Sequence, residues 1–274
     1  IIQGTSSPTP FELTTVLYVT GGAFTGLSEA ELQKRLSQMP PRPVGDFMFH
    51  LGRWESPLET NQCDQSSYSD FADLFSVSPL HTYLVPGYEE YNDCPDTWRS
   101  ELERYDERFW PTPSYTVNRQ VNHEENIAFV LNKILFVGVN VARTENQDPS
   151  VVLASDTAAI EWVQEHVDKN FPASEALVIF ANSGPDENWQ SDGFYQPLIE
   201  TIQQQTTITT IIVHLAPEGE SWSVDSQFDG MEKLVVARVE SGTWPPMRIL
   251  IDALDNRISV EQETWFDIEV PNGG

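Results

Sequence analysis

Side chains suited to acid–base or metal chemistry are few in this sequence and are spread along it. Five histidines are present, namely His50, His81, His123, His166 and His214. None belongs to a His-x-His or His-Glu-x-x-His motif, the spacings that place imidazoles around one zinc ion. Ser183-Gly-Pro lacks the frame of a nucleophile elbow, and no glycine-rich phosphate loop is present. We therefore expect structural or surface histidines, and we predict no catalytic nucleophile, no metal and no cofactor.

The densest charge lies between residues 89 and 107. Eight carboxylates stand in this segment against two arginines: Glu89, Glu90, Asp93, Asp96, Glu101, Glu103, Asp106 and Glu107. Carboxylate oxygens bind Ca²⁺, but the ordered spacing of an EF-hand loop is absent. The pattern favours a solvated charged face over a calcium site, and both interpretations stay open.

The overall charge excludes whole classes of partner. The 274 residues carry 42 Asp+Glu against 15 Lys+Arg, a formal net charge of -27, and 39% of the residues are hydrophobic. A chain of this composition buries a large core, and its surface repels phosphate backbones and anionic lipid headgroups. We therefore predict a globular protein with no nucleic-acid partner and no membrane insertion, in a saline setting that screens the charge.

The first residue and the cysteines indicate secretion. Ile1 stands where an unprocessed chain has Met, as after removal of a signal peptide. Cys63 and Cys94 are the only cysteines and lie in polar, turn-rich segments. We expect one disulfide between them, which closes a loop and stabilises by roughly 3 to 4 kcal/mol. Two free thiols are the alternative.

The chain start is unlike the rest. Residues 1–12 are rich in Gly, Ser, Thr and Pro and carry Ile1 and Ile2 at the tip, a composition typical of an extended arm. We interpret residues 13–274 as one domain. Ile1 and Ile2 can insert into a neighbouring subunit and give a head-to-tail contact, or the arm can fold onto its own domain.

Strands and helices alternate along that domain. Apolar or β-branched runs ending at turn residues predict strands at 14–20, 47–51, 81–85, 129–131, 134–140, 176–180, 208–213, 233–239, 248–251 and 258–260. Capping residues and apolar stripes predict helices at 28–38, 68–76, 158–169 and 195–205. Asp156 is the expected cap of the third helix. This order implies an α/β fold in which two sheets are flanked by helices.

Several short strings, taken in order, resemble the calcineurin-like metallophosphoesterase superfamily. They are Asp46-Phe-Met-Phe-His-Leu-Gly52, Leu84-Val-Pro-Gly87, Tyr91-Asn-Asp-Cys-Pro-Asp96, Ala176-Leu-Val-Ile-Phe180 and Ile212-Val-His214. The first looks like the strand that leads to the family's Gly-Asp metal motif, and the last looks like its final His motif. The resemblance implies a four-layer α/β/β/α sandwich of two mixed sheets, with a centre where Asp, Asn and His ligands hold two metal ions.

Most of the implied ligands are replaced. Arg53 stands at the position of the bridging Asp, and a permanent cation there repels divalent ions. Glu89 and Glu90 follow Gly87 in place of the Asn motif. Asn182 follows the fourth string with no His, and His214 survives. We predict that these five residues form a vestigial site in which Arg53 pairs with Glu89 or Glu90.

The loss of ligands suggests that the chain is not an enzyme. On this interpretation it is a secreted pseudoenzyme with a structural, assembly or binding role. It would act through an extracellular partner or through self-association into a homo-oligomer or filament. The alternative is an active metal-dependent phosphoesterase or other hydrolase with a rearranged site that uses Glu90 and His214.

Overall fold

The computed structural model gives the arrangement of most of the chain. It describes residues 14–24, 26–41, 44–53, 63–87, 90, 94–109, 113–141, 149–171, 173–185, 188–204, 208–217, 219–252 and 257–261. The arm at residues 1–12 lies outside these ranges, so the roles predicted for Ile1 and Ile2 stay predictions. Within the described ranges, no helix combines the length and apolar content needed to cross a bilayer.

The first sheet has five strands in the order β12-β11-β1-β2-β3. Their bounds are β1 Thr14–Gly21, β2 Phe47–Leu51, β3 His81–Val85, β11 Met247–Asp252 and β12 Arg257–Glu261. β1, β2 and β3 are parallel, whereas β11 and β12 pair antiparallel. The sheet is therefore mixed, and its three parallel strands end at the same edge.

The second sheet has seven strands in the order β4-β5-β6-β7-β8-β10-β9. Their bounds are β4 Asn118–Gln120, β5 His123–Leu131, β6 Ile134–Val139, β7 Ala176–Ala181, β8 Thr209–Leu215, β9 Ser223–Asp225 and β10 Leu234–Val239. β6, β7, β8 and β10 run parallel to one another. β5 and β9 pair antiparallel with the outermost of them.

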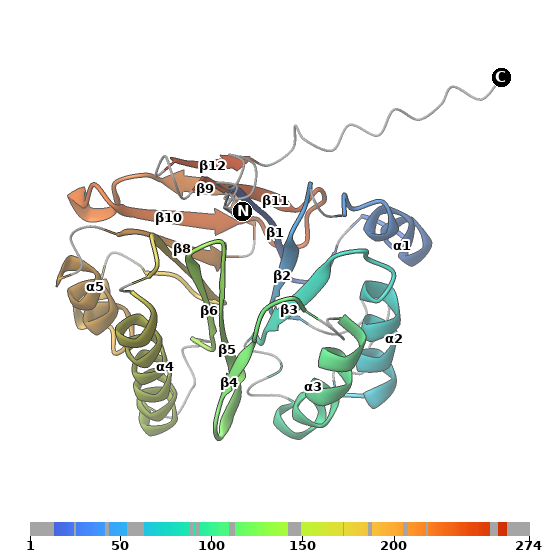
Figure 1. Ribbon diagram of the computed structural model, residues 1–274. Coiled ribbons are helices and arrows are strands. Elements are labelled where there is room, and N and C mark those ends of the chain that lie inside the picture. The colour runs from blue at the N-terminus through green and yellow to red at the C-terminus, as the bar shows by residue number, and fades with distance from the viewer. Residues whose placement is uncertain are drawn as a thin grey trace, which may run out of the picture.

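The two sheets pack face to face, with helices on both outer faces (Figure 1). Aromatic side chains fill the space between the sheets, where the ring of Phe49 stacks on that of Phe180 with centroids 3.7 Å apart. α1 Glu29–Ser37, α2 Gln65–Phe75 and α3 Pro95–Phe109 cover the first sheet, and α4 Pro149–Asn170 and α5 Tyr195–Gln204 cover the second. The predicted four-layer α/β/β/α sandwich of two mixed sheets is confirmed.

α3 was not predicted from the sequence. It lies in the acidic segment, yet every third or fourth side chain is apolar and buried: Trp98, Leu102, Tyr105 and Phe109. Two of its carboxylates bind arginines, because Glu101 accepts from Arg104 at 3.0 Å and Asp106 accepts from Arg119 Nε at 2.7 Å. These two carboxylates therefore have cationic partners already, which fits a charged helix face.

α4 begins earlier than predicted. The helix starts at Pro149 instead of residue 158, because proline suits the first turn, where its missing N–H is not needed. Asp156 is therefore inside the helix and is not its cap. Its side chain is buried against Gly193, where an added Cβ would lie 2.7 Å from Oδ2.

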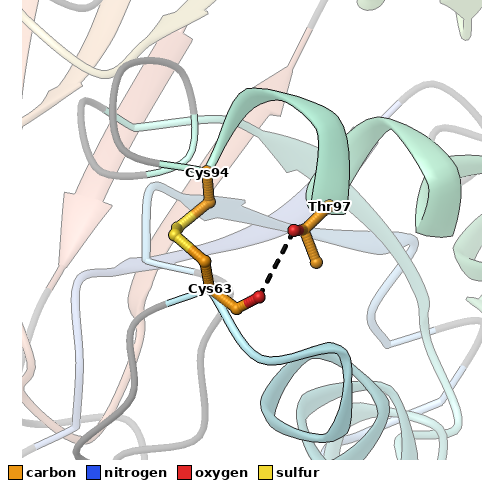
Figure 2. The surroundings of a disulfide bond; sticks show 3 residues. All are labelled: Cys63, Cys94 and Thr97. Carbon is orange, nitrogen blue, oxygen red and sulfur yellow. Dashed lines mark hydrogen bonds between the residues drawn. A yellow bond between two sulfur atoms is a disulfide. The ribbon is translucent and has the colours of Figure 1, made fainter.

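The predicted disulfide between Cys63 and Cys94 is present (Figure 2). It joins the residue before the cap of α2 to the residue before α3, across a Cα–Cα distance of 5.2 Å. Thr97 Oγ1 also donates to the Cys63 carbonyl at 3.3 Å. The bridge therefore holds together the amino-terminal ends of two helices that pack on the same sheet.

Candidate functional site

Strand ends from both sheets meet at one place in the molecule. A Cβ at Gly21, which ends β1, would lie 2.6 Å from Leu215 Cδ1 at the end of β8. A Cβ at Gly52, directly after β2, would lie 2.7 Å from Asn182 Oδ1, directly after β7. In sandwiches with parallel strands, ligands bind beside the carboxyl ends of the strands. The residues at the carboxyl ends of β2, β3, β7 and β8, and those directly after them, therefore form the candidate site.

Glu90 is the buried carboxylate of this site. It has no exposed surface, and its Oε2 accepts hydrogen bonds from two backbone amides. Gly87 N donates at 2.7 Å and Arg53 N at 3.1 Å. Since these amides follow β3 and β2 respectively, one oxygen atom ties the two loops together.

The loop after β2 requires an unusual backbone. Gly52 and Arg53 both have positive φ, 66° and 45°, a conformation that costs a residue with a side chain on the order of 1 kcal/mol. Gly52 and Gly87 also approach so closely that a Cβ on Gly87 would lie 2.9 Å from Gly52 Cα. Glycine at both positions lets the amides reach Glu90.

His50 supports the same loop and was not singled out by the sequence. Its Nε2–H donates to the Arg53 carbonyl at 3.1 Å, and the ring is fully buried among Phe24, Phe71 and Phe75. Burial lowers the pKa of His50 to about 4, and the hydrogen bonds to the Arg53 and Gly52 backbone oppose this effect. His50 is therefore neutral at pH 7, as a fixed donor to the loop.

Asn182 and His214 lie on the two sides of one turn. Asn182 Oδ1 faces Gly52 and is buried with no hydrogen-bond partner among the described residues. His214, at the end of β8, packs against Gly184, where a Cβ would lie 2.1 Å from its Nε2. The turn at residues 182–184 therefore links the Glu90 loops to His214.

The hydrogen bond of His214 fixes its tautomer. Nδ1 lies 2.8 Å from the Leu215 carbonyl, which can only accept, so Nδ1 carries the proton. Nε2 then has the lone pair, and within the described ranges it is buried without a partner. Burial lowers the pKa of His214 to about 4, opposed by the Leu215 carbonyl and aided by Arg238. His214 is thus a neutral imidazole whose buried Nε2 is an acceptor with no partner among the described residues.

The structure brings four of the five predicted site residues to the same strand ends. Arg53 is exposed, and its described contact with Glu90 runs through the backbone amide. Glu89 lies outside the described residues, so a pair between the Arg53 guanidinium and Glu89 stays a prediction. The backbone amides of Gly87 and Arg53 and the packing role of Gly184 were missed. The sequence signal for them was a glycine at a strand end or shortly after it, namely Gly52, Gly87 and Gly184.

The described residues do not fit the two-metal centre that the fold implies. The strand ends present Gly22, Gly52, Gly87 and an arginine where carboxylates and imidazoles would be needed, and Glu90 Oε2 already accepts two hydrogen bonds. In the part of the chain that the structure describes, no three His, Cys, Asp or Glu side chains are grouped to hold an ion. The described residues of this site therefore do not provide the ligands for two metal ions.

Comparison with solved structures identifies the fold. A protein from Thermus thermophilus, TT1561, aligns over 90% of this chain and 98% of its own, with a TM-score of 0.53 and 11% identity. A 5'-nucleotidase from Candida albicans aligns over 91% of this chain, with a TM-score of 0.54 and 14% identity. This chain has the calcineurin-like metallophosphoesterase fold. It spans half the length of the nucleotidase chain.

No family model and no curated protein sequence matches the chain. The chain nevertheless shares its fold with an enzyme, the 5'-nucleotidase. This finding corrects the expectation that the chain is not an enzyme. That expectation rested on the missing metal ligands at the positions that match the family's sequence motifs. The same strand ends hold the buried carboxylate of Glu90 and the unpartnered Nε2 of His214, the two residues named in the alternative of an active hydrolase.

Proposed function

We propose that this chain is a hydrolase that cleaves phosphoesters at the site formed by the strand ends of its two sheets. The fold supports an enzyme that acts on a phosphoester, since one solved structure of this fold is a 5'-nucleotidase. The observation that carries the proposal is the buried Nε2 of His214, which has no partner among the described residues and lies at the ligand-binding end of the fold.

The chemistry follows from the protonation state of His214. Its Nδ1–H is held by the Leu215 carbonyl, so Nε2 can accept a proton or a hydrogen bond from a water or hydroxyl group. Asn182 Oδ1, at the start of the same turn, is a second acceptor with no partner in the described ranges. A water that reaches Nε2 can donate a hydrogen bond to it and be oriented for attack. Of the two residues in the alternative prediction, His214 is therefore the better candidate for proton transfer.

A hydrolysis assay tests the proposal. Purified chain is incubated with p-nitrophenyl phosphate and bis(p-nitrophenyl) phosphate in separate reactions that contain Mn²⁺, Zn²⁺ or EDTA. We expect turnover by the native chain, and a loss of about 100-fold in His214→Gln, the range typical of general acid–base groups. Absence of turnover in every reaction would contradict the proposal, as would equal rates for the native chain and a folded His214→Gln variant.

His166→Gln is the matched control. His166 is also a buried histidine whose pKa is lowered by burial, but it lies on α4 with its ring against Trp162. The control separates loss of the His214 nitrogen from the general effect of removing a buried imidazole. We expect His166→Gln to keep its rate within about twofold of the native rate, because His166 lies on a helix outside the strand ends that form the site.

We also propose that the chain acts outside the cell. The disulfide supports this location, because such bridges persist in oxidising compartments, and the net charge of -27 suits a saline medium. Detection of the chain in culture medium with Cys63 and Cys94 oxidised, by mass spectrometry under alkylating conditions, is the expected result. Recovery only from the cytosol with both thiols alkylated would contradict it.

A further inference from the structure

Two amides that converge on one oxygen make an anion site within the fold. Gly87 N and Arg53 N come from different loops, and both donate to Oε2 of Glu90. Adjacent backbone N–H groups that point into one space are the usual protein cradle for an anionic oxygen. In this chain the oxygen belongs to the protein itself.

The cradle is held in shape by contacts that do not involve Glu90. Gly52 N donates to the Val85 carbonyl at 2.7 Å, which fixes the loop after β2 to the end of β3. His50 Nε2–H binds the Arg53 carbonyl, and the positive φ angles of Gly52 and Arg53 turn the Arg53 amide inward. The two amides are therefore oriented before any ligand is bound.

We propose that the amides of Arg53 and Gly87 form an oxyanion cradle in the hydrolase site, and that Glu90 is a specificity-determining residue whose carboxylate competes for this cradle with anionic ligands such as phosphate. The inference rests on the proposed function for the class of substrate. The cradle itself rests on the two hydrogen bonds and on the complete burial of Glu90.

The competition is both steric and electrostatic. A phosphate oxygen would accept hydrogen bonds from the same two N–H groups as Glu90 Oε2. The two oxygens therefore cannot occupy the cradle at the same time. The negative charge of Glu90, buried beside the cradle, also repels a second anion. Removal of the carboxylate therefore frees two donors and removes one repulsive charge.

Inorganic phosphate is the probe for this site. Binding is measured by isothermal titration calorimetry and by the thermal midpoint at constant ionic strength, with chloride replaced by phosphate. We expect Glu90→Ala to bind phosphate at least tenfold more tightly than the native chain, and its midpoint to rise with phosphate. A folded Glu90→Ala with no gain in phosphate affinity would overturn the proposal.

Glu101→Ala is the matched control. Glu101 is nearly as buried as Glu90, but its carboxylate binds Gln65 and Arg104, away from the two amides of the cradle. Its removal makes the net charge less negative by the same amount, so we expect no gain in phosphate affinity. An equal gain in both variants would also overturn the proposal, because it would show a general charge effect.

Glu90→Gln serves if Glu90→Ala does not fold. Glutamine keeps the volume and an acceptor oxygen but removes the charge, so we expect a gain of about threefold, and no gain would count against the cradle. Binding is measured without turnover. Failure of the native chain to hydrolyse phosphoesters therefore removes the proposed function, whereas failure of the variants to bind phosphate removes the cradle.

Discussion

The imidazole of His214 occupies the space that a side chain at Gly184 would need. A Cβ at residue 184 would lie 2.1 Å from Nε2 and 2.2 Å from both Cδ2 and Cε1 of that ring. The ring is held from the other side by its hydrogen bond to the Leu215 carbonyl. Gly184 and His214 therefore form one packing unit, in which the absence of a side chain positions the catalytic candidate.

Gly184→Ala is expected to displace the imidazole. The clash forces either the turn or the ring to move, which should lower the free energy of unfolding by about 2 kcal/mol, typical of overpacking in a well-packed core. The hydrolysis rate should fall with it. Urea unfolding followed by tryptophan fluorescence measures the first effect, and the phosphoester assay measures the second.

The double variant tests the cause of that loss. In a His214→Ala background the space is vacated, so the additional cost of Gly184→Ala should fall below about 0.5 kcal/mol. Equal costs in the two backgrounds would show that the alanine acts through the turn conformation and not through the ring.

Stability is expected to fall on acidification between pH 6.5 and about 4. Burial lowers the pKa of both His50 and His214 from 6.5 to about 4 in the folded chain, so the unfolded chain binds protons first as the pH drops. Stability is complete above pH 6.5 and is lost as the pH falls towards 4, by roughly 3 kcal/mol for each histidine. Urea midpoints at pH 7, 5.5 and 4 measure this slope.

Two variants test whether the buried histidines cause the loss of stability at low pH. His214→Gln removes one titrating group and should make the loss shallower by about half. His123→Gln is the control substitution, because the His123 side chain is 31% exposed and lacks the burial that acts on His50 and His214. A slope that responds equally to both substitutions would assign the acid sensitivity to other groups.

Removal of the disulfide is expected to destabilise the chain. The bridge closes a loop with a sequence separation of 31, so the variant Cys63→Ala/Cys94→Ala should lose about 3 to 4 kcal/mol. Urea unfolding of the variant and of the native chain, without reductant, measures the difference. A native chain that unfolds at the same urea concentration with and without dithiothreitol would contradict this expectation.

Added salt is expected to stabilise the chain. At a net charge of -27 the dominant long-range force between surface groups is repulsion, which salt screens. The thermal midpoint should rise by several degrees between about 10 mM and 500 mM NaCl. A midpoint that falls over this range would mean that attraction within ion pairs, such as Lys133 with Glu175, outweighs the repulsion.

Most strands could be predicted from the sequence, whereas β4, the first residues of β5, α3 and the start of α4 could not. Runs such as residues 14–20 and 176–180 are apolar enough to identify buried strands, and both are confirmed. α3 was missed because its apolar stripe from Trp98 to Phe109 is interrupted by charges that dominate the local composition. Helical periodicity, and not charge density, carried the signal there.

The site was predictable in its side chains but not in its backbone. Glu90, Asn182 and His214 were singled out by the resemblance to the metallophosphoesterase superfamily, and they lie at the strand ends that meet. The cradle consists of backbone N–H groups, which every residue except proline has. Its only distinctive features are Gly52, Gly87 and the positive φ of Arg53. The pairing of loops from different strands depends on the fold as a whole, which no local pattern encodes.

The bridge from Cys63 to Cys94 has a consequence beyond stability. Three residues separate the covalent anchor at Cys94 from Glu90, the side chain whose carboxylate fills the cradle. Reduction would therefore free the segment that links Glu90 to the covalent anchor at Cys94. It would also weaken the packing of α2 beside α3. The cradle proposal therefore predicts that the affinity for phosphate differs between the oxidised and the reduced chain.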